Sequence, residues 1–184
     1  SCATGTSSRR GQAIAERVAR SEFEIRVRPG ILFQPHPAFA KDESEKPLYL
    51  DLSEEQIASR YTLSDFKHTG TRELTAEDFI YQIKRLAHPR ATSPIFGHIS
   101  EYVEGLRELA QRLRKDNDAI VAAHRARYGS ADKGLPWLDL RPYELSGATA
   151  IDRYTYRIRI KGKYPQFMYW LAMPWKWLDQ GVNL

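Results

Sequence analysis

The chain has 184 residues, 42% of them hydrophobic and 28% charged, which is enough for one ordinary domain with its own core. Its net charge is +5, but Lys and Arg alternate with Asp and Glu along most of the sequence. This spread favours a solvated basic surface over a nucleic-acid-binding stripe, and the longest apolar run, residues 167–175, is too short to span a bilayer. We therefore expect neither a nucleic-acid partner nor a membrane span.

The sequence contains a single cysteine, Cys2, which excludes an internal disulfide and any zinc site made of several cysteines. Residues 1–10 are small and polar and lack the apolar centre of a signal peptide. A Cys followed by Ser, Thr and Gly resembles the start of a mature bacterial lipoprotein. Residues left from recombinant expression, or an arbitrary start of the chain, explain the same pattern equally well.

The first thirty residues predict a tail, a helix and a strand. Residues 1–11 are typical of a flexible tail, and apolar residues four apart predict a short helix over 12–20. Strict alternation of apolar and charged residues over 22–28 predicts a half-buried strand. The Pro-Gly pair at 29–30 and the apolar residues 31–33 predict that this strand continues into a hairpin.

The next stretch, residues 34–50, predicts a surface loop, because it combines a charged cluster with three prolines, which are Pro35, Pro37 and Pro47. Ser53 and Gln56 have the spacing of a capping box, which predicts a short helix that reaches about Arg60.

The clearest helix begins after Thr75, a good N-cap residue. Glu77 and Asp78 follow in its first turn, where the helix dipole favours negative charge, and Pro89 ends it. A second pattern of apolar residues at helical spacing runs from about 94 to 128 and predicts one long helical region.

The last third returns to strands. Residues 148–151 and 154–160 predict two strands joined by a tight turn at 152–153, and a short apolar helix follows over 166–172. The order of elements predicts an α+β fold, with a small antiparallel sheet and helices packed on one side of it.

Four stretches, in this order along the chain, resemble a known family: the extracytoplasmic solute-binding proteins of oligopeptide, dipeptide and nickel ABC importers (family 5). They are EFEIRVRPGILFQPH, GTRELTAEDFIYQIKRLAHP, ISEYVEGLRELA and ATAIDRYTYRIRIKGKYPQFMYWLA, and they span roughly residues 23–173. Members of this family are about three times as long and close two lobes around the ligand. The chain is similar only to the small subdomain of the first lobe.

The resemblance implies a partial or truncated peptide-binding protein of the periplasm, whose partners are an oligopeptide and an ABC permease, without catalysis and without a cofactor. It implies a family-like domain over 21–175, with 1–20 and 176–184 outside the family pattern. It assigns no ligand-binding residue here, because this subdomain contributes little to the ligand site. Two alternatives remain: a self-associating protein-interaction module that has kept the fold, and a basic nucleic-acid-binding protein.

The residues that could carry chemistry have simpler structural explanations. The histidines lack the spacing of metal ligands and are expected on the surface or at helix ends; they are His36, His68, His88, His98 and His124. We expect His88 in the last turn of a helix, where a cation complements the dipole. Glu77 and Asp78 fit a helix N-terminus better than an acid–base pair, and Cys2 has no organised base beside it. We therefore expect no catalytic residue and no metal site.

Aromatic residues gather near the end of the chain and leave three interpretations open. They are Tyr164, Phe167, Tyr169, Trp170, Trp175 and Trp177. Such a group can line a ligand site, form core at helical spacing, or remain exposed and favour self-association. On the third interpretation, the chain is not a simple monomer.

Overall fold

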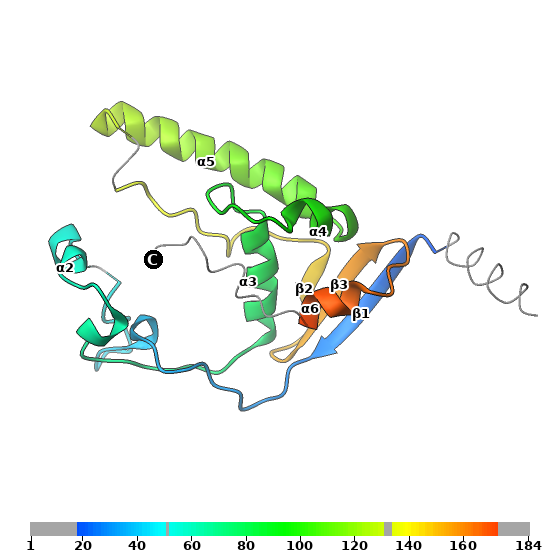
Figure 1. The fold of residues 1–184 in the computed structure, drawn as a ribbon, viewed down its shortest axis with the longest axis horizontal. Coiled ribbons are helices and arrows are strands. Elements are labelled where there is room, and N and C mark those ends of the chain that lie inside the picture. Colours follow the sequence, from blue (N-terminus) through cyan, green and yellow to red (C-terminus); the bar gives the residue numbers. More distant parts are fainter. Residues whose placement is uncertain (1–17, 51, 131–133, 173–184) are drawn as a thin grey trace, which may run out of the picture. The chain divides into compact units, whose positions relative to one another are not determined.

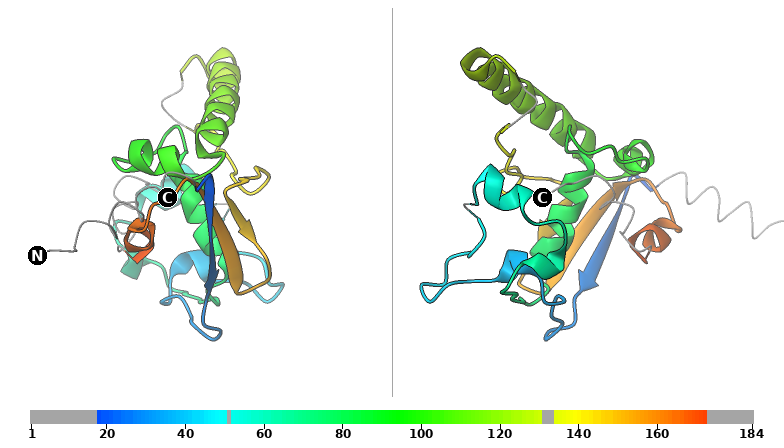
Figure 2. Two further views of the ribbon diagram at one scale, coloured as in Figure 1. Left: turned by 90° about the vertical axis from the view of Figure 1, so that its right-hand side faces the viewer. Right: turned by 60° about the vertical axis from the view of Figure 1, so that its left-hand side comes forward.

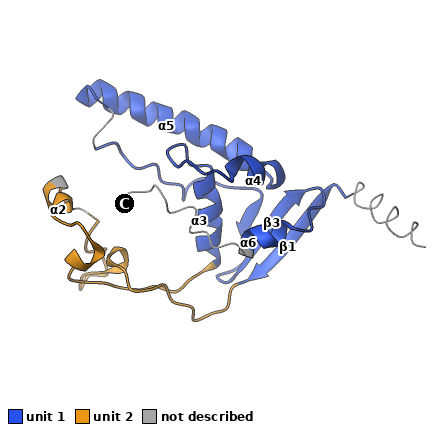
Figure 3. Ribbon diagram, viewed as in Figure 1, with its two compact units in different colours: residues 1–26, 76–184 blue, residues 27–75 orange. Residues whose placement is uncertain are grey.

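The computed structural model describes residues 18–50, 52–130 and 134–172. The chain divides into two compact units (Figure 3). We call residues 1–26 together with 76–184 the sheet unit, and residues 27–75 the loop unit. The extents predicted from the family resemblance stay predictions, since their outer boundaries lie beside or beyond the described residues.

The sheet unit contains one antiparallel sheet of three strands, β1 (Arg20–Arg26), β2 (Ala148–Ala150) and β3 (Thr155–Lys161), in the order β1-β3-β2 (Figure 1). The strands predicted over 22–28, 148–151 and 154–160 are confirmed, with bounds that differ by one or two residues. In the register of the sheet, Ile158 at the centre of β3 lies between Phe23 and Ala148. The turn between β2 and β3 is closed by the N–H of Ile151, which donates to the carbonyl of Thr155 at 2.8 Å.

The predicted hairpin between residues 22–28 and 31–33 is wrong, because β1 pairs with β3 instead. Alternation identifies a strand with two different faces, but it carries no information about the partner. Leu32 forms an isolated bridge with Glu73 within the loop unit. The predicted tail over 1–11 lies outside the described residues, as does the predicted helix from 12 to 17. Residues 18–20, the rest of that predicted helix, are not helical.

The predicted helix after Thr75 is confirmed as α3 (Ala76–Leu86), with Glu77 and Asp78 in its first turn. Its apolar side packs on the sheet. The ring of Phe79 stacks on that of Tyr156 in β3, with centroids 5.1 Å apart.

The helical region predicted as continuous from 94 to 128 is interrupted, which corrects the prediction: α4 covers Phe96–Tyr102 and α5 covers Leu106–Tyr128. Between them, Val103 forms a bridge with Ile160, and the N–H of Glu104 donates to the carbonyl of Arg159 at 3.1 Å. Near its end, beyond the residues that pair with β2, β3 thus hydrogen-bonds backbone groups that a continuous helix would have bonded internally.

The last helix, α6 (Phe167–Ala172), confirms the short apolar helix predicted there. Phe167 stacks on Phe23 of β1 with centroids 5.6 Å apart. The register places Phe23 on the same side of the sheet as Tyr156, which contacts α3. The predicted α+β fold with helices on one side of the sheet is therefore confirmed, and Figure 2 shows α3 and α6 on that side.

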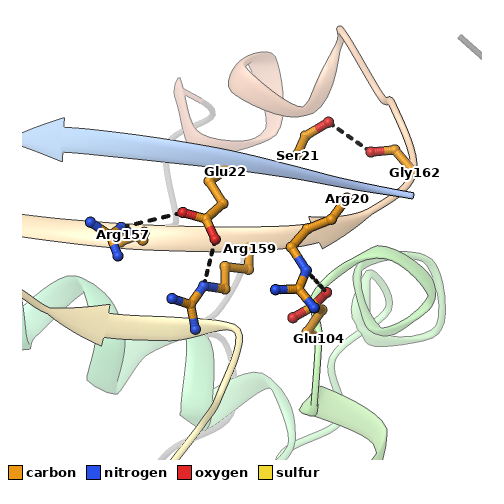
Figure 4. A network of polar contacts seen from close by, with 7 residues as sticks. All are labelled: Arg20, Ser21, Glu22, Glu104, Arg157, Arg159 and Gly162. Carbon is orange, nitrogen blue, oxygen red and sulfur yellow. Dashed lines mark hydrogen bonds and ion pairs between the residues drawn. The ribbon is translucent and has the colours of Figure 1, made fainter. Parts of the chain in front are cut away.

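The opposite face of the sheet carries charges (Figure 4). Arg159 donates from Nε to a carboxylate oxygen of Glu22 at 2.9 Å, and Arg157 lies 3.6 Å from the other oxygen of the same carboxylate. At the start of β1, Arg20 pairs with Glu104 at 2.9 Å. These cross-strand pairs are half-exposed, so the face contributes modestly to stability.

Most of the core lies in the sheet unit, on the apolar face of the sheet and on the helices. The largest fully buried side chains are Val103, Leu106, Leu109, Leu113, Leu140, Ile158 and Ile160. Among the helices of the described residues, none combines the length and the apolar character that crossing a bilayer requires.

The loop unit has little regular structure. Its one α-helix, α2 (Glu54–Ala58), begins at the predicted capping box, in which Ser53 and Gln56 bond reciprocally. The predicted loop over 34–50 is largely exposed and includes the 3-10 helix Pro37–Phe39.

Candidate functional site

A cavity of about 600 Å³ lies inside the sheet unit, between α3, the first turns of α5 and the segment 144–150 that leads into β2. We call it the pocket. α3 contributes Glu77, Ile80 and Lys84 to its lining. The volume is within the range of roughly 300–1,000 Å³ that is usual for small-molecule sites.

Two glycines set the wall of the pocket by allowing close backbone contact. Gly105 begins α5 with φ 75°, and a Cβ at this position would lie 2.4 Å from Oγ of Ser146. A Cβ at Gly147 would lie 2.3 Å from the carbonyl oxygen of Glu104. The lack of a side chain at both positions therefore lets the segment around Ser146 pack closely against the start of α5.

The lining carries charges of both signs. Glu77 and Glu108 lie in the first turns of α3 and α5, where the dipoles of the two helices favour carboxylates. Lys84 and Arg112 supply the positive charge, and Nη2 of Arg112 donates to the carbonyl of Glu144 at 2.8 Å.

Lys84 is the most unusual of these residues, because it is 9% exposed although it carries a charge. Its charge acts on the nearby carboxylate of Asp139. Hydrogen bonds from Arg141 are the main reason that the pKa of Asp139 is lowered, and the positive charge of Lys84 adds to the effect. Lys84 therefore lines the pocket, and its charge also acts on a carboxylate outside the lining.

Hydroxyl groups and apolar atoms complete the lining. Ser146 and Thr149 add hydroxyls, while Ile80, Leu145 and Ala148 add apolar surface. A ligand with an ammonium at one end and a carboxylate at the other would find an opposite charge for each end.

The aromatic residues near the end of the chain separate into different environments. Tyr164 and Trp170 join His98 and Tyr102 of α4, and we call these four residues the aromatic cluster. Tyr102 and Tyr164 stack with centroids 4.4 Å apart, and His98 lies 4.7 Å from Trp170. Nε1 of Trp170 donates to the hydroxyl of Tyr164 at 3.0 Å, which fixes the two rings relative to each other.

The remaining predicted aromatics differ from this cluster. Phe167 is buried in the core against Phe23, so the core interpretation is correct for this residue. Tyr169 is exposed. Trp175 and Trp177 lie outside the described residues, as does Cys2.

The histidines are dispersed, and no group of three His, Cys, Asp or Glu side chains in the described ranges could hold a metal ion. His36 caps the 3-10 helix Pro37–Phe39, accepting at Nδ1 from the N–H of Ala38. His68 is exposed in the loop unit, and His124 is buried on α5 beside Tyr128.

His88 departs from the prediction. It lies two residues beyond the end of α3, and it is buried. Burial lowers its pKa, and the charges of Arg90 and Arg85 lower it further. The predicted role as a cation that complements the helix dipole is therefore wrong, because this environment favours the neutral ring.

The charged lining of the pocket was not predicted from the sequence. Its members come from segments more than twenty residues apart, so no local spacing reveals them. One signal was present: Lys84 follows Ile80 by four residues and therefore shares its buried face of α3. Glu77 was predicted to lie at a helix start rather than in an acid–base pair. The structure places it in the first turn of α3, and it also lines the pocket.

The pocket and the aromatic cluster both belong to the sheet unit, within the part of the chain that the structure describes. Their residues come from α3, α4, α5, α6 and the strand-flanking segments. In comparisons with known proteins, no family model, no curated protein and no solved structure matches the chain.

Proposed function

We propose that this chain is a non-catalytic binding domain for short peptides, part of a periplasmic solute-binding protein that delivers peptides to an ABC permease. The observation that carries the proposal is the pocket, whose lining offers cations, carboxylates and hydroxyls around an apolar wall. The resemblance of four ordered stretches to family 5 binding proteins supports the role in peptide import independently, but it assigns no ligand-binding residue to the pocket. Peptide binding of this kind requires no cofactor.

The charges of the pocket fit the chemistry of a peptide. Lys84 and Arg112 would attract a terminal carboxylate, and Glu77 and Glu108 would attract a terminal ammonium. Lys84 is buried, which strengthens an ion pair with it relative to the same pair in water, whereas Glu77, Glu108 and Arg112 are exposed. The hydroxyls of Ser146 and Thr149 would form hydrogen bonds with the amide groups between the two ends of the peptide.

In a complete two-lobed protein, a bound peptide would stabilise the closed arrangement of the lobes, and the permease would recognise that arrangement. A domain of one lobe would hold only one side of such a ligand. We therefore expect weak binding by this chain alone. Binding costs translational and rotational freedom, and a single lobe offers fewer contacts to offset this cost.

A thermal-shift titration against a mixed library of di- to pentapeptides tests the proposal. We expect a saturating rise of the melting temperature, because a ligand that binds only the folded state stabilises it by about 2.7 kcal/mol at a hundred times its Kd. Arg112→Gln should abolish the rise. The matched control is Arg114→Gln, an exposed arginine of the same helix outside the pocket.

An absent shift in a cooperatively melting protein would contradict the proposal. Equal shifts in the Arg112→Gln and Arg114→Gln variants would also contradict it, since binding would then lie elsewhere.

A second candidate function, self-association as a protein-interaction module, is favoured by the loop unit. Several of its large apolar side chains are more than half exposed; they are Leu32, Leu50, Ile57 and Leu63. Exposed apolar side chains mark interaction sites where they gather into a patch. Light scattering at tens of micromolar should give a mass above 21.2 kDa, and Leu50→Asp should lower it. A monomeric mass for the unchanged chain would exclude this function.

A further inference from the structure

The loop between α3 and α4 contains three buried polar atoms that have no hydrogen-bond partner among the described residues: Nε2 of His88, Nη2 of Arg90 and Oγ of Ser93. Folded proteins leave few such groups, since a polar group buried without a partner loses its hydrogen bonds to water and gains none in return. Three of them within six residues indicate that something outside the described chain completes the loop.

His88 presents a donor at its unpartnered atom. Its Nδ1 accepts a hydrogen bond from the N–H of Arg90 at 3.1 Å, so in the neutral ring the proton lies on Nε2. The lowered pKa of His88, caused first by burial, is consistent with this neutral form. Trp137 stacks on the ring with centroids 5.1 Å apart and planes 18° apart, which holds the Nε2–H in one direction.

Arg90 presents a second donor and a positive charge. Its Nε donates to Oδ1 of Asn117 at 2.6 Å, and its Nη1 donates to the carbonyl of Pro136 at 2.9 Å. Both partners are neutral, so they orient the guanidinium without balancing its charge. No carboxylate in the described ranges forms an ion pair with Arg90, and burial lowers the pKa of the guanidinium, which is the cost of this unbalanced charge.

The hydroxyl of Ser93 is the third group, and backbone turns keep the loop compact around it. The N–H of Ala91 donates to the carbonyl of His88 at 3.0 Å, and the N–H of Phe96 donates to the carbonyl of Ser93 at 3.3 Å. An imidazole N–H, a guanidinium N–H and a hydroxyl form a donor set with net positive charge. Such a set suits an acceptor that carries several oxygens and a negative charge.

We propose that His88, Arg90 and Ser93 form a binding site for an oxyanion, either a phosphate-type anion or a carboxylate. The site is separate from the pocket, whose lining includes none of the three residues. It does not depend on the proposed peptide-binding function.

Titration of the full chain with inorganic phosphate, with sulfate and with acetate tests the proposal, at constant ionic strength set with sodium chloride. The readouts are the melting temperature and the ¹⁵N resonances of His88 Nε2 and Arg90 Nε. We expect saturable changes at these nitrogens. Ser93→Ala should weaken binding about tenfold, since it removes one hydrogen bond to a charged group. Arg90→Gln should abolish binding.

The matched control is Thr92→Ala, which removes an exposed hydroxyl next to the site and should leave binding unchanged. Since Arg90→Gln also removes two structural hydrogen bonds, Ser93→Ala is the variant that decides if Arg90→Gln fails to fold. Binding of phosphate and sulfate without acetate would assign a tetrahedral anion, and binding of all three would assign the carboxylate class as well.

Two results would overturn the proposal. No change with the anions beyond the effect of chloride would mean that water alone fills the loop. Equal binding by Ser93→Ala and Thr92→Ala would place the anion elsewhere.

Discussion

The sheet unit and the loop unit are stabilised in different ways. In the sheet unit, leucine, isoleucine and valine side chains are fully buried between the sheet and its helices. In the loop unit, only Val27, Pro37 and Ala40 are buried among the described residues. Burial of apolar area is the main favourable term in folding, at about 25 cal/mol per Å². The two units should therefore respond very differently to the same kind of substitution.

The loop unit relies on local contacts instead. The guanidinium of Arg72 lies 4.7 Å from the ring centre of Phe33 and 5.3 Å from that of Phe39, and Arg60 lies 5.1 Å from that of Phe66. Contacts of this kind contribute about 0.5–1 kcal/mol each at exposed sites. A unit of this type is expected to open at low free energy.

The largest expected effect is at the centre of the sheet. Ile158→Ala should lower the free energy of unfolding by about 2–5 kcal/mol, because it leaves a cavity at a fully buried position. Leu50→Ala, in the loop unit, should change it by less than about 0.5 kcal/mol, because that side chain is 74% exposed. Urea denaturation measures both. Equal losses would show that the contrast between the units is wrong.

The next effect concerns close backbone contact beside the pocket. Gly147→Ala should cost about 1–3 kcal/mol, since the added Cβ would meet backbone atoms of Glu104 that cannot turn away. Gly97→Ala is the control within α4, where a Cβ would meet no atom within 4 Å. That change should raise stability by up to about 1 kcal/mol through helix propensity. Thermal melts of both variants would refute the packing argument if their melting temperatures shifted together.

A third effect tests whether the burial in the sheet unit extends to a titrating group. Burial, Arg90 and Arg85 lower the pKa of His88 in the folded protein below its unfolded value of about 6.5. The unfolded chain therefore takes up the proton first, and this group removes stability as the pH falls below about 6.5.

His88→Gln should reduce this acid-side loss of stability, while the difference between variant and wild type stays constant above about pH 7.5. Urea midpoints between pH 5 and 8 measure it. Parallel curves for the two proteins would contradict the lowered pKa.

The smallest expected effect is on the charged face of the sheet. Arg159→Gln removes the pair with Glu22 and should cost about 0.2–1 kcal/mol, decreasing at high salt. A double-mutant cycle with Glu22→Gln isolates the coupling between the two side chains. The exposed Lys41–Glu45 pair of the loop unit should show no measurable coupling, and a larger coupling there would reverse the comparison.

Local pattern was sufficient for the elements of the sheet unit but not for their connections. Alternation located β1 and β3 because each has one apolar face, and the acids after Thr75 located the start of α3. The break between α4 and α5 was not predictable, because Val103 and Leu106 keep helical spacing across it. Only the competing bonds from β3 end the first helix there.

The sites were less predictable than the elements. The pocket depends on charges from three distant segments, and only the position of Lys84 on a buried helix face hinted at it. The unpartnered donors of His88, Arg90 and Ser93 depend on the conformation of a loop, which residue types do not determine. In the loop unit, the capping box of α2 was predictable because it is encoded within four residues.

The pairing of β1 with β3 has a consequence for how the molecule reaches its fold. Glu22 and Arg159 meet across 137 positions of the sequence, and Ser21 bonds to Gly162 across 141. Such distant contacts form slowly, because a long loop must close before any of them is gained. On a ribosome, β1 would emerge early and wait without a partner until β3 had been synthesised, while α5 could already form from neighbouring residues. Refolding should therefore be limited by the docking of the first strand, and the waiting strand is the segment most exposed to aggregation.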